Sequence, residues 1–381
     1  MCSRGVSLVS TVYCVLGVLY FSGSVAGTLA EHAGQQLQSP SGFVSFDAPG
    51  AGTGVGQGTF PNGVTPTGAI TGFYVDPNNV NHAFLRTREG TITTFAAPGA
   101  GNGPFQGTIA FGMNSAGAIT GLYFDASNTF HGYVRTPEGA ITTFDAPGAG
   151  TGAMQGTQSG NINPAGEISG IFVDANGVHQ VFLRAPDGTI TTLDVPGAVG
   201  GAINPTFYGL SPAGGLTGFY FDANGASHGF VRAPNGAYTT FDAPGAGTSG
   251  GQGTQPLNIN SSGATAGSVV DSSNVVHGFV RAHDGTVTTF DPRASQATFP
   301  FSINPSGVVA GFYLDANTVD HGFLREPGGT IRTFDAPGAG TSALQGTVLV
   351  GNNPAGTLTG YYADASNVAH GFVVTKEPSG P

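Results

Sequence analysis

Residues 41–52 read Ser-Gly-Phe-Val-Ser-Phe-Asp-Ala-Pro-Gly-Ala-Gly, a short apolar strand that runs into a glycine-rich turn. Related phrases recur six more times along the chain of 381 residues. The equivalent aromatic or leucine positions are Phe46, Phe95, Phe144, Leu193, Phe241, Phe290 and Phe334, which are 49, 49, 49, 48, 49 and 44 residues apart. A period of this length is typical of proteins in which each repeat forms one small sheet.

The third copy contains four strand-like segments in succession, separated by turns rich in Asn, Asp, Pro and Gly. The segments are residues 154–162, 167–173, 179–184 and 189–193. Short turns between strands predict sequential antiparallel hairpins. Four such strands in roughly 45 residues are typical of one blade of a β-propeller, whereas the alternative, a β-solenoid, has shorter coils.

The two ends of the chain complement each other. The last repeat reaches His370-Gly-Phe-Val-Val374 and ends without a fourth strand, while the strand at residues 43–47 has no repeat in front of it. We expect residues 43–47 to complete the last repeat, because this pairing leaves no bare sheet edge. The sequence therefore predicts an all-β fold: a seven-bladed β-propeller of four-stranded antiparallel blades, closed by the N-terminal strand.

The composition limits the possible partners. The chain contains 65 Gly and 25 Pro, no Trp, 11 Lys and Arg, and 22 Asp and Glu, with a formal net charge of −11. An acidic chain is repelled by nucleic acid and by anionic membrane surfaces, so we expect neither as a partner of the mature form.

The first thirty residues have the pattern of a secretory signal peptide. Arg4 precedes the apolar run Val6–Tyr20, and small residues follow. An uncleaved membrane anchor is the alternative, but the run is short for a span. The predicted organisation is a signal peptide (1–30), an N-terminal tail (31–41), the propeller (42–375) and a C-terminal tail (376–381). Both Cys lie in the leader, so we expect a disulfide-free monomer that is secreted or periplasmic.

A recurrent triplet opens the third strand of most repeats. It stands as Asn81-His-Ala-Phe84 in the first copy and as His131-Gly-Tyr133, His228-Gly-Phe230, His277-Gly-Phe279, His321-Gly-Phe323 and His370-Gly-Phe372 in later ones. Each follows a Gly-x-x-x-Gly-x-aromatic strand such as Gly307–Tyr313. Over residues 42–375 the chain resembles the bacterial extracellular repeats of the HAF family. The resemblance implies secretion and repetition, and it supplies no catalytic residue.

Each repeat also has an Asp at the end of its second strand and a His at the start of its third. The pairs are Asp76 and His82, Asp125 and His131, Asp174 and His179, Asp222 and His228, Asp271 and His277, Asp315 and His321, and Asp364 and His370. An Asp and a His that face each other across a hairpin could form a catalytic pair. A structural hydrogen-bonded pair is favoured, because seven identical catalytic sites in one ring are implausible. One carboxylate per turn is too few for a calcium site, so no metal or cofactor is expected, with calcium as the remaining alternative.

The candidate binding residues lie at the start of the first strands and in one shortened connection. A Gln followed two residues later by Thr recurs at Gln57, Gln106, Gln155, Gln252, Gln296 and Gln345. These residues could form polar rings around the central channel, or they could bond to neighbouring blades and trapped water. Arg293 lies in the short connection 291–296 and could pair with an anionic group; a neutral loop deletion is the alternative. We expect this end of the strands to be the binding face.

These features favour a secreted binding or scaffold module for an extracellular protein or a neutral glycan. The absence of Trp weakens the glycan interpretation, because sugar sites favour flat aromatic faces. One alternative is a propeller-type polysaccharide lyase or hydrolase, although no residue can be named as catalytic. A second is a purely structural cell-surface repeat protein.

Overall fold

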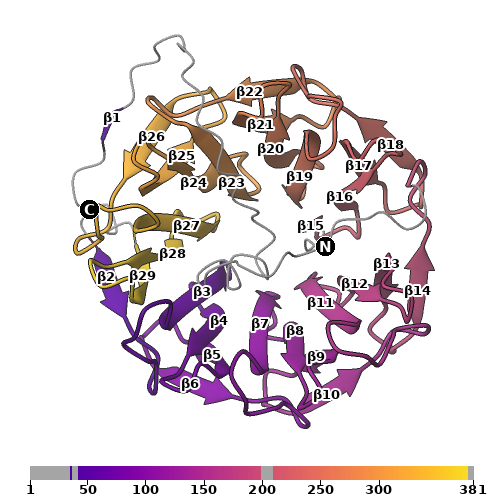
Figure 1. Cartoon of the computed structure of the whole chain (residues 1–381), viewed down its shortest axis with the longest axis vertical. Coiled ribbons are helices and arrows are strands. Elements are labelled where there is room, and N and C mark those ends of the chain that lie inside the picture. Colours follow the sequence, from indigo (N-terminus) through magenta and orange to yellow (C-terminus); the bar gives the residue numbers. More distant parts are fainter. Residues whose placement is uncertain (1–34, 37–41, 199–208, 376–381) are drawn as a thin grey trace.

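The computed structural model describes residues 35–36, 42–198 and 209–375, which form β-strands joined by turns and loops. The strands lie in consecutive groups arranged around a ring (Figure 1). Within each group the strands lie side by side and succeed one another from the centre of the ring to its edge. We therefore refer to inner, second, third and outer strands. The all-β prediction is confirmed, and the strands of the third copy match the predicted segments to within two residues.

The inner strands are β3 (Gly58–Val64), β7 (Gly107–Met113), β11 (Gly156–Ile162), β15 (Gly209–Leu210), β19 (Gly253–Ile259), β23 (Ala297–Ile303) and β27 (Gly346–Asn352). The second strands are β4 (Ile70–Val75), β8 (Ile119–Phe124), β12 (Ile168–Val173), β16 (Leu216–Phe221), β20 (Thr265–Val270), β24 (Val309–Leu314) and β28 (Leu358–Ala363).

The third strands are β5 (Asn81–Arg86), β9 (Phe130–Arg135), β13 (His179–Arg184), β17 (Ser227–Arg232), β21 (Val276–Arg281), β25 (Asp320–Arg325) and β29 (Ala369–Val374). The outer strands are β2 (Phe43–Phe46), β6 (Ile92–Phe95), β10 (Ile141–Phe144), β14 (Ile190–Leu193), β18 (Tyr238–Phe241), β22 (Val287–Phe290) and β26 (Ile331–Phe334).

Two recurrent glycines allow the strands of one group to pack closely. β7 bulges between Ala110 and Gly112 opposite β8, and a Cβ on Gly121 would overlap the carbonyl oxygen of Ile109. Gly132 of the His-Gly-Tyr triplet lies under the ring of Phe144, which a Cβ would approach to 2.8 Å. The triplet therefore has a small central residue because the outer-strand aromatic ring lies over it.

Neighbouring groups are joined by apolar and aromatic contacts. Phe95 of β6 packs edge-on against Tyr133 of β9, with ring centroids 6.2 Å apart. The guanidinium carbon of Arg135 lies 4.9 Å from the centroid of the same Phe95 ring, a cation–π contact across the seam. The same contact joins Arg86 to Phe46, Arg184 to Phe144, Arg281 to Phe241 and Arg325 to Phe290. Each of these guanidinium groups also donates to the carbonyl of the next residue, as Arg135 does to Thr136 at 3.2 Å. The arginines therefore help to hold neighbouring groups together.

The strand nearest the N-terminus completes the last group. β2 runs antiparallel to β29, with Phe43 opposite Val374 and Phe46 opposite Gly371. β29 also meets β3 in parallel at Ala369 and Gly58. The predicted pairing of the first strand with the last repeat is therefore present in the structure.

Outside the repeats the structure describes a single short strand. In the predicted N-terminal tail, β1 (Gln35–Gln36) pairs in parallel with β26, which the sequence did not indicate. The predicted signal peptide (1–30) and C-terminal tail (376–381) lie outside the described residues. No helix able to cross a membrane occurs among the residues that the structure describes.

Candidate functional site

The two faces of the ring are built from different connections. The loops from outer to inner strands lie beside the turns from second to third strands, since the Gly101 amide donates to the carbonyl of Phe124 at 2.8 Å. We call this side the loop face, and it combines the two sets of connections that the sequence placed together. The opposite side, the turn face, carries the tight turns between inner and second strands and between third and outer strands.

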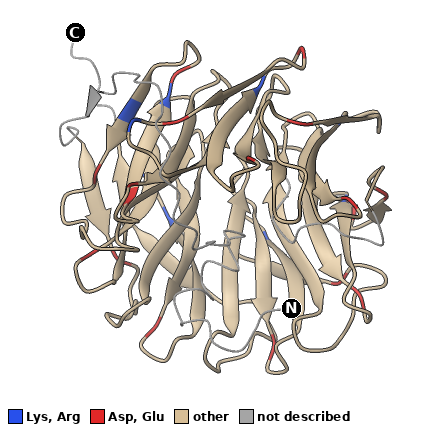
Figure 2. Cartoon of the chain, turned by 45° about the horizontal axis from the view of Figure 1, so that its top comes forward, with Lys and Arg blue, Asp and Glu red and all other residues tan. Residues whose placement is uncertain are grey.

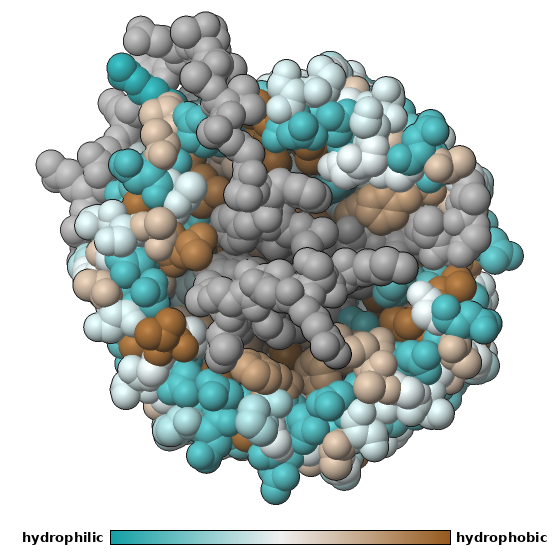
Figure 3. Space-filling model, viewed as in Figure 1, coloured by the Kyte–Doolittle hydropathy of each residue, from teal (hydrophilic) through white to brown (hydrophobic). Residues whose placement is uncertain are grey.

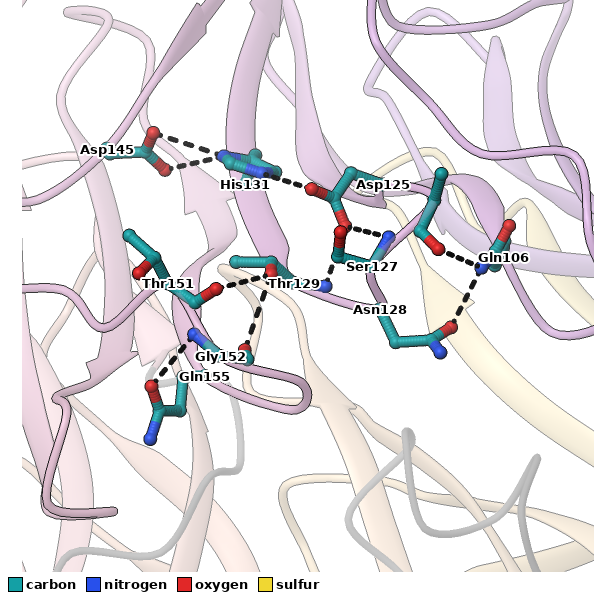
Figure 4. Close-up of polar contacts among 11 residues, drawn as sticks. Gln106, Asp125, Ser127, Asn128, Thr129, His131, Asp145, Thr151, Gly152 and Gln155 are labelled. Carbon is teal, nitrogen blue, oxygen red and sulfur yellow. Dashed lines mark hydrogen bonds and ion pairs between the residues drawn. The ribbon is translucent and has the colours of Figure 1, made fainter.

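On the loop face, each second strand ends in an Asp that organises the following turn. The Oδ1 atom of Asp125 accepts hydrogen bonds from the backbone amides of Ser127 and Thr129, at 2.8 and 2.9 Å (Figure 4). Burial acts to raise the pKa of Asp125, but these two bonds and His131 outweigh it and lower the pKa below its usual value. Asp125 is thus an ionised residue whose carboxylate holds the turn together.

The His of the third strand lies between two carboxylates. The Nδ1 atom of His131 is 2.9 Å from Oδ1 of Asp145, and its Nε2 atom is 3.6 Å from Oδ2 of Asp125 (Figure 4). The imidazole also stacks on Tyr123, with ring centroids 4.8 Å apart. Asp145 follows the outer strand, and sequence reasoning missed its part in this cluster. The Asp–His pairing across the hairpin is confirmed, with a second Asp added.

The same Asp–His–Asp cluster occurs in four more groups. The members are Asp222, His228 and Asp242; Asp271, His277 and Asp291; Asp315, His321 and Asp335; and Asp364, His370 and Asp47. The hydrogen bond to Asp291 is the main cause that raises the pKa of His277, and the bond to Asp335 does the same for His321. Both imidazole nitrogens face a carboxylate, which leaves neither for a substrate proton. The clusters therefore act as structural clamps at the edge of the ring.

Two groups depart from this cluster. In the first group Ala96 takes the place of the second Asp, so His82 faces only Asp76, at 3.3 Å. In the third group Gln180 occupies the histidine register opposite Phe172, and His179 lies one residue earlier. Burial lowers the pKa of His179, so this imidazole is neutral around neutral pH. Among the described residues no cluster of His, Cys, Asp or Glu is arranged to hold a metal ion.

The glutamines predicted as binding residues lie at the base of the loops. Oε1 of Gln106 accepts a bond from the Gly103 amide at 2.9 Å, and Nε2 donates to the Ala126 carbonyl and to Asn128 Oδ1 (Figure 4). Each side chain therefore ties its own loop to its own turn. Gln57, Gln155, Gln252 and Gln345 make the same loop and turn-carbonyl bonds.

The threonines that follow these glutamines do not line a channel. Thr108 is fully buried, and its Oγ1 atom accepts a bond from the Ala97 amide at 2.9 Å. Thr59, Thr157, Thr254 and Thr347 are equally buried and bond to the equivalent loop amides. Of the two alternatives, the polar ring does not apply to these threonines, because their hydroxyls are buried and fix the loops. The fourth copy of this motif, at 204–206, lies outside the described residues.

The shortened connection at 291–296 holds the two remaining predicted residues. Arg293 and Gln296 are both exposed on the loop face. Thr298 donates to Asp291 at 2.6 Å and contacts Ser295, so this loop is held by side chains different from those of its neighbours. The structure brings neither Arg293 nor Gln296 together with the other predicted glutamines.

A groove lies on the turn face, between the group β3–β6 and the group β7–β10. Its volume is about 490 Å³. The lining residues are Thr67, Ala69, Leu85, Thr87, Arg88, Glu89, Met113, Gly117 and Pro137. It lies opposite the face that the sequence favoured for binding.

Two residues of the groove depart from the repeat pattern of the turn face. Arg88 stands where the other described turns have Pro137, Pro186, Pro234, His283 and Pro327. Thr67 likewise stands where the other repeats have Ala or Ser. Glu89 is fully exposed, and a bond from its own backbone amide, the Thr87 hydroxyl and the charge of Arg88 lower its pKa. The sequence signal for this groove, which sequence reasoning missed, was the replacement of a turn proline by arginine.

No protein-family model and no characterised protein sequence matches the chain. Many solved structures match the chain, and three of them illustrate the range. The BP39L lectin from Burkholderia pseudomallei has 13% sequence identity and a TM-score of 0.53, with 82% of this chain and 94% of the lectin covered. TolB from Acinetobacter baumannii has 12% identity and a TM-score of 0.45, with 69% and 65% covered. A puromycin-hydrolyzing peptidase from Mycobacterium tuberculosis has 12% identity and a TM-score of 0.45, with 91% and 58% covered.

The chain thus spans nearly all of the lectin but less than two thirds of the other two proteins. At these identities the similarity concerns the fold alone, and the conclusion about the fold rests on the lectin. The chain is an all-β protein with a β-propeller-like fold.

Proposed function

We propose that the chain is a secreted, seven-bladed β-propeller that binds a neutral glycan in the groove between the groups β3–β6 and β7–β10. The blade count is supported by the repeat period and by the pairing of β2 with β29, which gives the last group its fourth strand. Export is supported by the leader pattern of residues 1–30.

The chemistry of the groove carries the glycan proposal. Arg88 and Glu89 together offer donors and acceptors to sugar hydroxyls, and Thr67 and Thr87 add two hydroxyl groups. Leu85, Met113 and Pro137 supply an apolar surface against which the C–H face of a sugar ring can pack. One positive and one negative side chain leave the lining without net charge, so a neutral sugar fits better than an acidic one. The volume of about 490 Å³ is within the range of small-molecule sites.

The fold adds further support. A propeller-like lectin shares the arrangement over most of both chains, so the architecture is compatible with sugar binding. The carrying observation remains the pair Arg88 and Thr67, which departs from the repeat in two neighbouring turns at the groove; among the described turns of this face, His283 is the other departure from the turn proline. A single binding site in a repetitive ring requires such a difference.

The test is a glycan array with purified residues 31–381, followed by calorimetric titration of the best neutral oligosaccharide. Arg88→Pro restores the residue of the neighbouring turn and should weaken binding at least about tenfold. Glu89→Ala should also weaken it, whereas Glu138→Ala, at the same position of the next turn, should not. Glycan binding that is unaffected by both groove variants would refute the groove as the site. Release of shorter sugars would favour the lyase or hydrolase alternative.

A further inference from the structure

Large apolar side chains are exposed in four corresponding loops of the loop face. Val55, Phe105, Met154 and Leu344 have exposed fractions of 62%, 37%, 59% and 36%. Each lies one or two residues before the glutamine that precedes an inner strand: β27 for Leu344, β3 for Val55, β7 for Phe105 and β11 for Met154. These inner strands are neighbours around the ring (Figure 1). We call the four side chains the apolar arc.

Three members of the apolar arc have an unfavourable backbone conformation. Phe105, Met154 and Leu344 have φ values of 66°, 61° and 63°, in the left-handed region that glycine adopts most easily. The conformation serves the fold, because the Phe105 amide donates to the Asn79 carbonyl of the preceding group at 2.6 Å. Met154 and Leu344 donate in the same way to Asn128 and Thr318.

The chain itself shows that the side chains are dispensable for this bond. Gly56 and Gly251 occupy the same position, with φ values of 75° and 84°. Their amides donate to the carbonyls of Asn367 and Gly225, at 2.8 and 3.0 Å. Glycine therefore meets the needs of the fold here, while Phe, Met and Leu add strain and exposed apolar surface. These side chains reduce the stability of the folded chain in two ways, through the strained backbone and through the exposed apolar surface. Their presence therefore indicates a role outside the folded monomer.

The apolar arc lies on an acidic face. Thirteen aspartates belong to the part of the loop face that the structure describes, seven at the ends of second strands and six after outer strands. The same described loops contain one arginine, Arg293. Figure 2 shows acidic residues in the loops and turns at the ends of the strands. The face viewed in Figure 3 has separate hydrophobic patches among hydrophilic ones. An acidic face repels a second acidic copy of this chain and an anionic lipid surface.

We propose that the apolar arc is a docking surface for a cationic, amphipathic segment of another protein, whose apolar residues contact the arc while its Lys and Arg face the surrounding aspartates. This surface is on the opposite face from the proposed glycan groove and does not depend on it. Alternating apolar anchors and a charged surround are the usual pattern of peptide-binding surfaces. Attraction between opposite charges also predicts that added salt weakens the interaction.

The experiment titrates residues 31–381 into a fluorescently labelled 15-residue peptide of Leu and Lys with a helical amphipathic pattern. A scrambled peptide of the same composition is the first control. The triple variant Phe105→Gly, Met154→Gly and Leu344→Gly should bind the amphipathic peptide at least about tenfold more weakly and should melt within about 2 °C of the parent or above it. Val44→Ser removes an exposed valine on β2 and should change nothing, as should Arg88→Pro.

Several outcomes would overturn the proposal. Equal binding of the scrambled peptide, or unchanged binding by the triple variant, would reduce the interaction to general charge attraction. A large loss of thermal stability in the triple variant would mean that the side chains serve the fold. Concentration-dependent self-association of the parent, removed in the triple variant, would assign the arc to a second copy of the chain. Binding of phosphatidylserine vesicles in place of the peptide would assign it to a lipid surface.

Discussion

Two seams of the ring join groups that are assembled differently. At the internal seam, β3–β6 meets β7–β10, and each group is one continuous stretch of chain. At the terminal seam, β3–β6 meets the last group, in which β2 pairs with β29 although the two strands are far apart in the sequence. At both seams the chain passes from the outer strand of one group to the inner strand of the next, from β6 to β7 and from β2 to β3. The contacts across the two seams are the same. Arg86 lies 4.8 Å from the Phe46 ring at the terminal seam, and Arg135 lies 4.9 Å from Phe95 at the internal one.

The backbone links match as well. The Gly56 amide donates to Asn367 across the terminal seam at 2.8 Å, as Phe105 donates to Asn79 across the internal seam. Asn353 adds a bond from its side chain to the Thr65 carbonyl at 2.9 Å. The comparison indicates that a group assembled from two distant parts of the chain forms the same seam as a group built from one continuous stretch. What distinguishes the internal seam is Phe105 on the loop face and Arg88 on the turn face, the residues on which the two binding proposals depend.

The largest expected effect comes from removing β2, which is held in the last group by pairing with β29 and not by a direct chain connection to it. Deletion of residues 31–48 from the mature chain removes β2, the Phe46 ring under Arg86 and the Asp47 partner of His370. We expect Tm to fall by more than about 10 °C, because β29 and the seam lose their partners together. Moving residues 31–48 to follow Lys376 should restore Tm. Calorimetry that finds the deletion variant as stable as the parent would show that the terminal seam does not need β2.

The second prediction compares the two seams directly. Phe46→Ala and Phe95→Ala should each lower the free energy of unfolding by about 2 kcal/mol, because each removes a half-buried ring and a cation–π partner. Denaturant titration of both variants gives the two values. A much smaller loss for Phe46→Ala than for Phe95→Ala would mean that the terminal seam is weaker than its geometry indicates.

The third prediction concerns pH. The raised pKa of His277 and His321 means that their stabilisation is complete below the usual value of 6.5 and is lost as the pH rises through the raised values. The lowered pKa of Asp271 and Asp315 means that their stabilisation is present above the usual value of 3.8 and is lost as the pH falls below it. Tm should therefore be highest in mildly acidic solution and decline toward pH 9. His277→Gln should make the decline of Tm at alkaline pH less steep. An unchanged decline would mean that the Asp–His–Asp cluster is not its cause.

The smallest effect is expected from repairing the first group. Ala96→Asp should give His82 the second carboxylate that Asp145 gives His131, and should add about 0.5 kcal/mol of stability. The gain should shrink in concentrated salt, which screens an exposed ion pair. A gain that persists in concentrated salt would point to an effect on the loop backbone in place of the ion pair. Ala96→Asn is the matched uncharged control.

The strand positions could be predicted because the repeats show apolar runs bounded by turn residues in every copy. The role of β2 could be predicted from one missing and one surplus strand. The second Asp of each clamp could not be found from the sequence. Asp145 and His131 are 14 residues apart and come together only because β10 lies beside β9. The cation–π contacts were not found for a similar reason, since Arg135 and Phe95 belong to different groups.

The candidate site was less accessible to sequence reasoning than the fold. Gln57 precedes β3, which begins at Gly58, so strand alternation does not determine where its side chain points. The groove depends on how two neighbouring turns approach each other, which no single repeat shows. Arg88 was visible in the sequence as a charge that breaks the pattern, but its neighbours Met113 and Pro137 come from the next group.

The pairing of β2 with β29 also has a consequence for biosynthesis. Asp47 and His370, which meet beside this pair, are 323 residues apart. A ribosome makes β2 before the strands of the other groups and makes β29 after them, so β2 must wait for its partner while those strands are synthesised. A chain that is truncated before β29 leaves β2 without its partner and exposes a strand edge that quality-control proteases can recognise. The final sheet thereby makes completion of the fold conditional on completion of the polypeptide.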